Sequence, residues 1–180
     1  MNPLNKRLQK GEADAFAELY DMMGEKIYRY AYSQLRSSQD ATDVVQEIFV
    51  RLVKSHRSLA RAENLNSYVF AAARNETIRW RAKNKNRNQQ AQPLVEPATN
   101  RDATEKLTDG NDWVSNILQS LDPVDQEIVH LKAITKLTFK EIAEAMQMEQ
   151  ANVTTRYRRA MLKLQSTLSS QQPNNKNAVQ

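Results

Sequence analysis

Apolar residues in the C-terminal third of the chain recur at helical spacing in two short runs separated by a polar break. Thr138 is followed three residues later by Glu141, the pattern of a capping box at a helix start. Behind this cap, and again from about Gln150, apolar side chains repeat every three to four residues. The inward-facing sets are Phe139, Ile142, Ala143 and Met146 in the first run, and Val153, Tyr157, Ala160, Met161, Leu164 and Leu168 in the second. Two short helices joined by a tight turn predict a helix-turn-helix.

Gln147 lies in the middle of the predicted turn, where a left-handed backbone conformation favours glycine. If the turn adopts that conformation, the strain is on the order of 1 kcal/mol. Met146 and Met148 flank the position and can bury enough apolar surface to offset this cost. The motif is therefore expected to form without a glycine.

The second helix of this motif turns polar and basic side chains away from its apolar stripe. At about 100° per residue, its outward face holds Ala151, Asn152, Thr155, Arg158, Arg159 and Leu162, flanked by Thr154 and Arg156. Asn and Arg match the adenine and guanine edges in a major groove, and further basic side chains meet phosphates. The alternative is a solvated basic face on a packing helix. DNA recognition is the favoured interpretation.

Apolar periodicity also predicts helices in the N-terminal half. The predicted segments are residues 13–20, 27–35, 41–55 and 68–87, with a polar break and cap at 37–40 and a loop at 59–65. Asn66 or Ser67 is expected to cap the last of these helices. Aromatic residues in the first two segments are interpreted as core and boundary residues.

The predicted helix at 41–55 has a polar face opposite its apolar stripe. Asp43, Gln46 and Glu47 lie on that face, with Val50 among them. Two carboxylates and an amide could bind a metal ion, but no clustered His and no third acid lie nearby in the sequence. A solvated face and a protein-docking surface remain, and the exposed Val50 favours docking.

The predicted helix at 68–87 interleaves aromatic and basic residues. Between Arg79 and Arg87, five of nine residues are basic and none is acidic. Aromatic rings stack on unpaired bases, while Arg and Lys follow the phosphates. The alternative is a basic helix end favoured by the helix dipole. This composition favours single-stranded nucleic acid as the ligand.

The composition changes at residues 88–111, where two prolines and many amides show no sustained period and predict a linker. A helix is predicted over residues 112–121, and Asp122 with Pro123 is expected to cap and start another. These helices would pack on the apolar faces of the two helices of the helix-turn-helix. The predicted fold class is all-α, with two small helical domains at 13–87 and 112–168, a flexible linker at 88–111 and a disordered tail at 169–180.

Composition narrows the class of protein further. The net charge of +5 favours a polyanionic partner. The chain has no cysteine, which excludes disulfides and thiolate zinc sites. It shows no signal-peptide core and no apolar run of about 18 residues, so a cytoplasmic protein without membrane insertion is expected. His56 and His130 are the only histidines and no glycine-rich phosphate loop occurs, so no catalytic residue, metal or cofactor is predicted.

Four segments carry a further pattern: the acidic helix at Asp43–Phe49, Ala73–Asn75 in the basic helix, Leu121–Pro123, and Glu141–Ala143. Together these segments resemble the signature regions of bacterial RNA polymerase sigma factors of the sigma-70 family. Their order and spacing in two helical modules with a short linker are similar to the small extracytoplasmic-function group, over residues 13–87 and 112–168. The resemblance implies a promoter-specificity subunit that binds core RNA polymerase at the β′ clamp helices and the β flap, and that is not itself an enzyme.

The resemblance also implies roles for individual residues. Asp43, Gln46 and Glu47 would face the polymerase, the loop at 61–66 would form a pocket for a flipped base, and the linker would run through the polymerase cleft. The residues implied for the opened −10 strand are Asn64, Tyr68, Arg74, Asn75, Trp80, Arg81 and Lys83. Those implied for the −35 duplex are Asn152, Thr154, Thr155, Arg156, Arg158 and Arg159. Whether an anti-sigma factor is a further partner stays open.

Three positions depart from the family pattern. Thr42 stands where an acid is usual, which slightly weakens the docking charge, and Arg79 stands where Asp is common, which makes the strand-facing helix more basic. Thr154 stands where Lys or Arg is common, so we expect the upstream sequence that is read to differ from the usual one. The alternative function is a stand-alone helix-turn-helix regulator that binds duplex DNA as a dimer. That alternative leaves the acidic face at 43–47 and the basic helix around Trp80 unexplained.

Overall fold

The computed structural model describes residues 3–90, 118 and 120–171, and this part of the chain contains helices and no strand. The helices are α1 (Pro3–Lys10), α2 (Ala13–Leu35), α3 (Ser38–Lys54), α4 (His56–Arg61), α5 (Leu65–Gln90), α7 (Pro123–Thr135), α8 (Phe139–Met146) and α9 (Gln150–Gln171). The predicted all-α class is confirmed. We call α1–α5 the first module and α7–α9 the second module.

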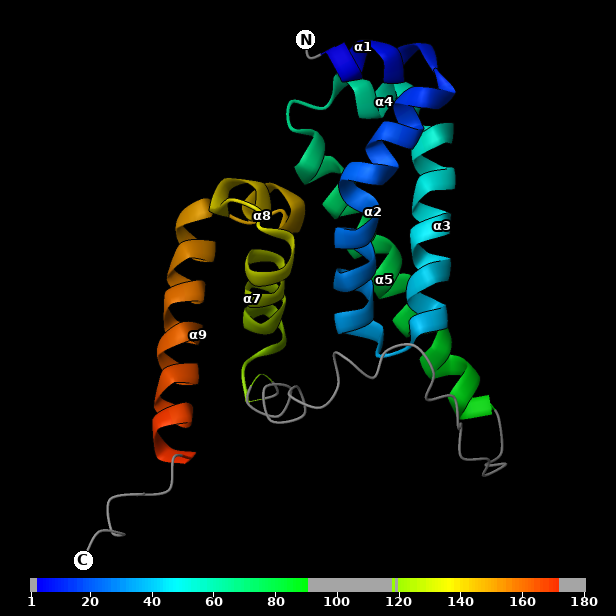
Figure 1. The fold of residues 1–180 in the computed structure, drawn as a ribbon. Helices are drawn as coiled ribbons and strands as arrows, with labels where there is room; N and C mark the ends of the chain where they lie inside the picture. Colours follow the sequence, from blue (N-terminus) through cyan, green and yellow to red (C-terminus); the bar gives the residue numbers. More distant parts are fainter. Residues whose placement is uncertain (1–2, 91–117, 119, 172–180) are drawn as a thin grey trace, which may run out of the picture.

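In the first module, α2 and α3 lie side by side with α5 behind them, and α1 and α4 meet at one end (Figure 1). Ser37 caps α3 as predicted, because its side chain accepts a hydrogen bond from the backbone N–H of Asp40. The largest fully buried side chains come from all the long helices of the module and include Leu19, Tyr30, Ile48 and Phe70. The module therefore has an ordinary packed core.

Several local features of the first module differ from the sequence prediction. The helix α1 was not predicted; it lies before residue 13 and buries Leu4 and Leu8. The two runs expected at 13–20 and 27–35 form the single helix α2, and α4 occupies part of the expected loop. Asn64 caps α5, since its side-chain oxygen accepts from the backbone N–H of Ser67, so the predicted caps at Asn66 and Ser67 were wrong.

The second module contains the predicted helix-turn-helix, formed by α8 and α9. Asp122 caps α7 through the backbone N–H of Val124. The capping box of α8 is complete, with the Thr138 hydroxyl accepting from Glu141 N and the Glu141 carboxylate accepting from Thr138 N. Gln147 has φ 55° and ψ 47°, the left-handed conformation that the turn was expected to require. These local predictions are confirmed.

The apolar stripe of α9 is narrower than predicted. Val153, Ala160 and Leu164 are buried, but Met161 and Leu168 are 41% and 39% exposed. Among the described residues, this end of α9 packs only on a small cluster that includes Leu121 and Val129 of the α7 side, which cannot cover the whole stripe. The helix also continues through residues 169–171, which were predicted as disordered tail.

Some predicted segments fall outside the described part of the chain. Residues 88–90 of the predicted linker belong to α5, and 91–111 lie outside the described residues. The same holds for most of the helix predicted at 112–121 and for tail residues 172–180.

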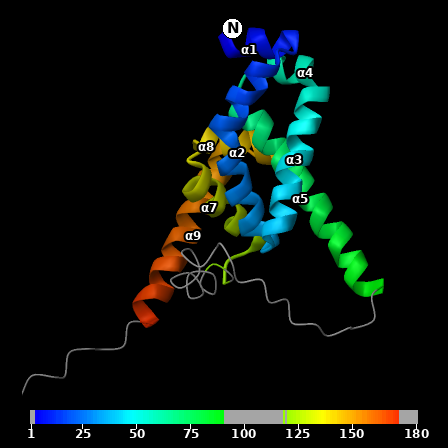
Figure 2. The ribbon, with the colours of Figure 1, turned by 45° about the vertical axis from the view of Figure 1, so that its right-hand side comes forward.

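The two modules pack directly on each other. The helix α7 contacts α2, and α8 contacts α5, so buried residues of both modules form one continuous apolar cluster. The turned view shows α7 and α8 against the first module, with the C-terminal ends of α5 and α9 on opposite sides of the molecule (Figure 2). No periodicity in the sequence predicted this arrangement.

The capping box of α8 is expected to contribute measurably to the stability of the protein. We expect Thr138→Ala to lower the free energy of unfolding by about 1 kcal/mol, because the backbone N–H of Glu141 at the start of α8 loses the hydroxyl that accepts its hydrogen bond. Thermal unfolding followed by circular dichroism measures the effect. Thr138→Ser keeps the hydroxyl and should restore most of the loss. An equal loss in the Ser variant would assign the effect to the Thr138 methyl group instead.

Candidate nucleic-acid interface

The helix α9 presents most of its predicted duplex-contacting residues to solvent. Asn152, Thr155, Arg158 and Arg159 are exposed, and Thr154 and Arg156 are partly buried. The hydroxyls of Thr154 and Thr155 donate to backbone carbonyl oxygens one turn earlier in the same helix. The helix therefore offers an amide and at least two arginines to a ligand.

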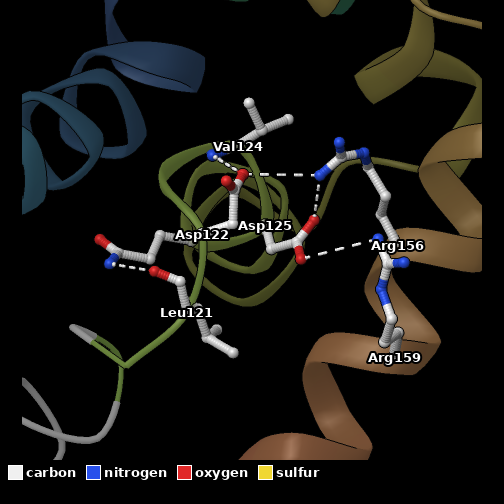
Figure 3. A network of polar contacts seen from close by, with 7 residues as sticks. Leu121, Asp122, Val124, Asp125, Arg156 and Arg159 are labelled. Carbon is white, nitrogen blue, oxygen red and sulfur yellow. Dashed lines mark hydrogen bonds and ion pairs between the residues drawn. The ribbon is translucent and has the colours of Figure 1, made fainter.

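Among the predicted duplex-contacting residues, Arg156 forms the closest ion pair with another part of the protein. Its Nη1 donates to Asp125 Oδ1 at 2.6 Å and lies 3.5 Å from Asp122 Oδ1, as Figure 3 shows. Only 28% of its side chain is exposed, and Asp125 is buried. Sequence periodicity could not predict this pair, because its members lie 31 residues apart.

The predicted strand-contacting residues at the C-terminal side of α5 form an accessible basic surface. Arg81 and Lys83 are exposed, and Lys83 Nζ lies 5.5 Å from the centre of the Trp80 ring. A polar hollow of about 200 Å³ lies beside them, lined by Glu47, Glu76, Arg79, Trp80 and Lys83. Glu47 of the acidic α3 face and Trp80 of the basic α5 face therefore share one side of the first module.

Other predicted strand residues lie against the second module instead. Arg74 Nε is 2.9 Å from the Glu127 carboxylate, which also accepts a hydrogen bond of 2.7 Å from the Tyr30 hydroxyl. Asn64 and its neighbour Asn66 donate to Glu141 Oε1 at 3.3 and 2.7 Å. Tyr68 is half-buried, packed against the core, while Asn75 is exposed. The predicted strand surface is therefore divided: one part is open and another is covered by acidic residues of the second module.

Burial and charge perturb three groups at this junction of the modules. Burial, together with the Glu127 carboxylate, raises the pKa of Tyr30 well above its ordinary value, which keeps the hydroxyl protonated as a donor. Burial tends to raise the pKa of Glu141, but hydrogen bonds from Thr138, Asn66 and Asn64 outweigh it and lower that pKa. Burial and the nearby charge of Arg36 lower the pKa of His130 to about 4.

The depressed pKa of His130 predicts a specific loss of stability in mild acid. His130 is 7% exposed, and its Nδ1 lies 2.9 Å from the Gln34 amide. Between its ordinary pKa of 6.5 and about 4, the unfolded state binds a proton that the folded state excludes, so stability falls as the pH drops through this window. We expect the urea midpoint to decline from pH 7 to pH 5, and His130→Gln to flatten that slope. His56→Gln is the matched control, and an unchanged slope in the His130 variant would contradict the prediction.

The acidic face of α3 carries an apolar patch. Gln46 and Glu47 are exposed and Asp43 is partly buried, while Val50 and Val53 are 47% and 46% exposed. On α2, Tyr20 is 52% exposed and packs its ring 4.9 Å from that of Phe49. Exposed apolar side chains bordered by acids are typical of a protein-docking surface. The exposure of Val50 expected from the sequence is confirmed.

Within residues 3–90, 118 and 120–171, no three His, Asp or Glu side chains are grouped so as to hold a metal ion. None of the described helices has the length and apolar character needed to span a bilayer.

Comparison with known proteins matches both modules. Residues 19–87 match the family model described as Sigma-70 region 2, and residues 111–164 match Sigma-70, region 4. The chain is 28% identical to the ECF RNA polymerase sigma factor SigW of Bacillus subtilis over 176 residues, covering 91% of this chain and 94% of that protein. It is 27% identical to the ECF RNA polymerase sigma factor BldN of Streptomyces coelicolor, covering 89% of this chain and 63% of that protein.

Two solved structures share its fold. CnrH in complex with the cytosolic domain of CnrY has a TM-score of 0.70 and 22% identity, over 93% of this chain and 96% of that one. The sigma factor RpoE of Bartonella quintana, in complex with the anti-sigma factor NepR, has a TM-score of 0.67 and 21% identity, over 88% of this chain and 98% of that one.

Proposed function

The chain belongs to the sigma-70 family and is an RNA polymerase sigma factor of the extracytoplasmic-function group, and on that premise we propose how its residues divide the work at a promoter. The first module docks on the β′ clamp helices of core polymerase through Asp43, Gln46 and Glu47. The second module contacts the β flap and binds the −35 element as duplex through α9. Along α5, the first module holds one strand of the opened −10 element.

The observation that carries this proposal is the separation of two nucleic-acid surfaces with different chemistry. On α5, an aromatic ring and several cations lie together, the combination that stacks on unpaired bases and follows their phosphates. On α9, an amide and arginines extend from one exposed helix face, the combination that fits a major groove. Flipping bases out of a duplex costs a few kcal/mol, which stacking and phosphate contacts offset.

The packing of the modules adds a requirement. Arg74 and Asn64 pair with Glu127 and Glu141 of the second module, so they become available to a DNA strand only when the modules separate. We propose that binding to core polymerase supplies this separation and that the isolated chain therefore binds DNA weakly. No step of this role requires catalysis, a metal or a cofactor from the chain itself.

Initiation in a purified system tests the proposed function. We expect the chain with core polymerase to initiate from promoters selected out of a genomic fragment library, and initiation no higher than with core alone would overturn the proposal. Trp80→Ala should lower initiation roughly five- to 150-fold, because the stacking of one base on a ring contributes about 1–3 kcal/mol. Trp80→Phe retains a ring and is the matched control.

The stand-alone regulator is the less favoured function. It would bind a palindromic duplex tightly as a dimer without polymerase, and it gives no role to the acidic face of α3. The match to both sigma-70 models favours the polymerase-dependent function. Since the chromosome and polymerase are the proposed partners, we expect the protein to act in the cytoplasm. An anti-sigma protein is a further proposed partner, in line with the partner of RpoE.

A further inference from the structure

Asp125 lies where α7 begins and faces two arginines of α9 (Figure 3). One of its oxygens accepts from Arg156 at 2.6 Å, and the other lies 4.0 Å from Arg159 Nη2. The Asp125 side chain is only 9% exposed, so its charge is shielded from solvent and directed at these two cations. A single carboxylate thus bridges positions 156 and 159 on the helix that faces DNA.

The two arginines are held to different degrees. Arg156 makes a short charge-assisted hydrogen bond, has a second acid, Asp122, at 3.5 Å, and is 28% exposed. Arg159 is 66% exposed and approaches Asp125 with one nitrogen, so its other donors face solvent. Arg156 is therefore held by a hydrogen bond, whereas Arg159 is attracted by the Asp125 carboxylate at 4.0 Å, beyond hydrogen-bond distance, and stays mostly exposed.

We propose that Asp125 is a positioning residue that sets the sequence discrimination of the second module, an inference that rests on the proposed duplex-binding role of α9. It withholds Arg156 from the DNA phosphates and orients Arg159 toward a guanine edge in the major groove. Arg156 is then an internal ion-pair partner, not the direct duplex contact that the family resemblance implied.

The consequence for specificity follows from the two kinds of DNA contact. A phosphate contact strengthens binding to every sequence equally and carries no sequence information. An arginine held in a fixed direction can donate two hydrogen bonds to guanine, which discriminates against other bases by about 1–3 kcal/mol. Holding Arg156 back while orienting Arg159 therefore lowers binding to unrelated DNA and preserves binding to the preferred site.

Two measurements on the full-length chain test this proposal. The first is the salt dependence of binding to an unrelated duplex. Asp125→Asn should free Arg156 to make one more phosphate contact, which steepens the log–log slope by about 0.9 and strengthens binding roughly fivefold near 0.15 M salt. The second is selection from a duplex library with a randomised −35 segment, using the chain bound to core polymerase. Arg159→Ala should abolish the base preference at one position of the selected DNA. Asp125→Asn should weaken the preference at that same base pair.

Matched variants separate positioning from a general structural or charge effect. Glu144→Gln removes an equal charge from α8, where Glu144 is 3.9 Å from Lys140, and should leave the slope and the selected sequence unchanged. Asp125→Glu should keep most of the discrimination. Adding Arg156→Gln to Asp125→Asn should return the slope to that of the wild type.

Two outcomes would overturn the proposal. An unchanged salt slope in soluble, helical Asp125→Asn would mean that Arg156 is not withheld from phosphates. A flatter slope in Arg156→Gln alone would mean that Arg156 already contacts DNA in the wild type. Failure of the proposed function gives a different result, since the wild-type chain would then select no sequence from the library with core polymerase.

Discussion

Reversing both acidic charges on the exposed face of α3 is expected to abolish assembly with core polymerase. In Asp43→Lys/Glu47→Lys, two repulsive contacts replace two attractive ones at the proposed docking surface. Close charge pairs across protein interfaces couple by at least about 1.5 kcal/mol each, so the double reversal should weaken binding by more than about a hundredfold. Competition binding to purified core polymerase measures the loss.

The variant should fold normally. Glu47 is exposed and Asp43 is only partly buried, and the one ion pair described for these two acids is the 3.5 Å contact of Glu47 with Arg51 in the same helix. The matched control reverses Asp21 and Glu25, two exposed acids with the same four-residue spacing on α2. An affinity for core polymerase within threefold of that of the control would show that this face of α3 does not bind the polymerase. The proposed division of work between the modules would then be wrong.

The second large effect is expected at the junction of the modules. Glu127→Lys places a cation beside Arg74 in a site where only 13% of the Glu127 side chain is exposed. Removing one partner from a largely buried ion pair costs several kcal/mol, and we expect at least about 2 kcal/mol here because Arg74 is partly solvated. The ratio of separated to packed modules should therefore rise roughly thirtyfold.

This change has two readouts. The chain has no cysteine, so Lys54→Cys and Gln165→Cys, at exposed positions of α3 and α9, provide unique sites for a fluorescent donor and acceptor. Energy transfer should fall in the Glu127→Lys background. Affinity for a single-stranded oligonucleotide should rise, since a larger fraction of molecules is competent to bind. Glu144→Lys introduces the same charge at an exposed position of α8 and is the matched control. Energy transfer as high in Glu127→Lys as in this control would contradict the prediction.

Features governed by neighbours in the sequence could be predicted well. The Thr138–Glu141 capping box, the caps at Ser37 and Asp122 and the left-handed Gln147 all depend on side chains within a few residues, whose preferences are short-range. The expected exposure of Val50, Asn152 and Arg158 followed from helical periodicity in the same way.

Features created by distant residues could not be predicted. The helices α1 and α4 span only eight and six residues, too few to be stable alone, and they are stabilised by packing on each other. The sequence indicated that Arg74 and Arg156 are basic and near a ligand surface. It did not indicate that each has an acidic partner on another helix, because nothing in a single sequence connects Arg74 with Glu127 or Arg156 with Asp125.

Glu141 illustrates how one carboxylate can link two properties of the protein. Its Oε2 accepts from Thr138 at the start of α8, while its Oε1 accepts from Asn64 and Asn66 across the junction. A substitution that loosens the junction at Glu141 would also damage the DNA-reading motif. Glu127 contacts Arg74 and Tyr30 across the junction and takes no part in the capping box of α8. We therefore expect substitutions at Glu127, unlike those at Glu141, to change the packing of the modules without loss of the helix-turn-helix.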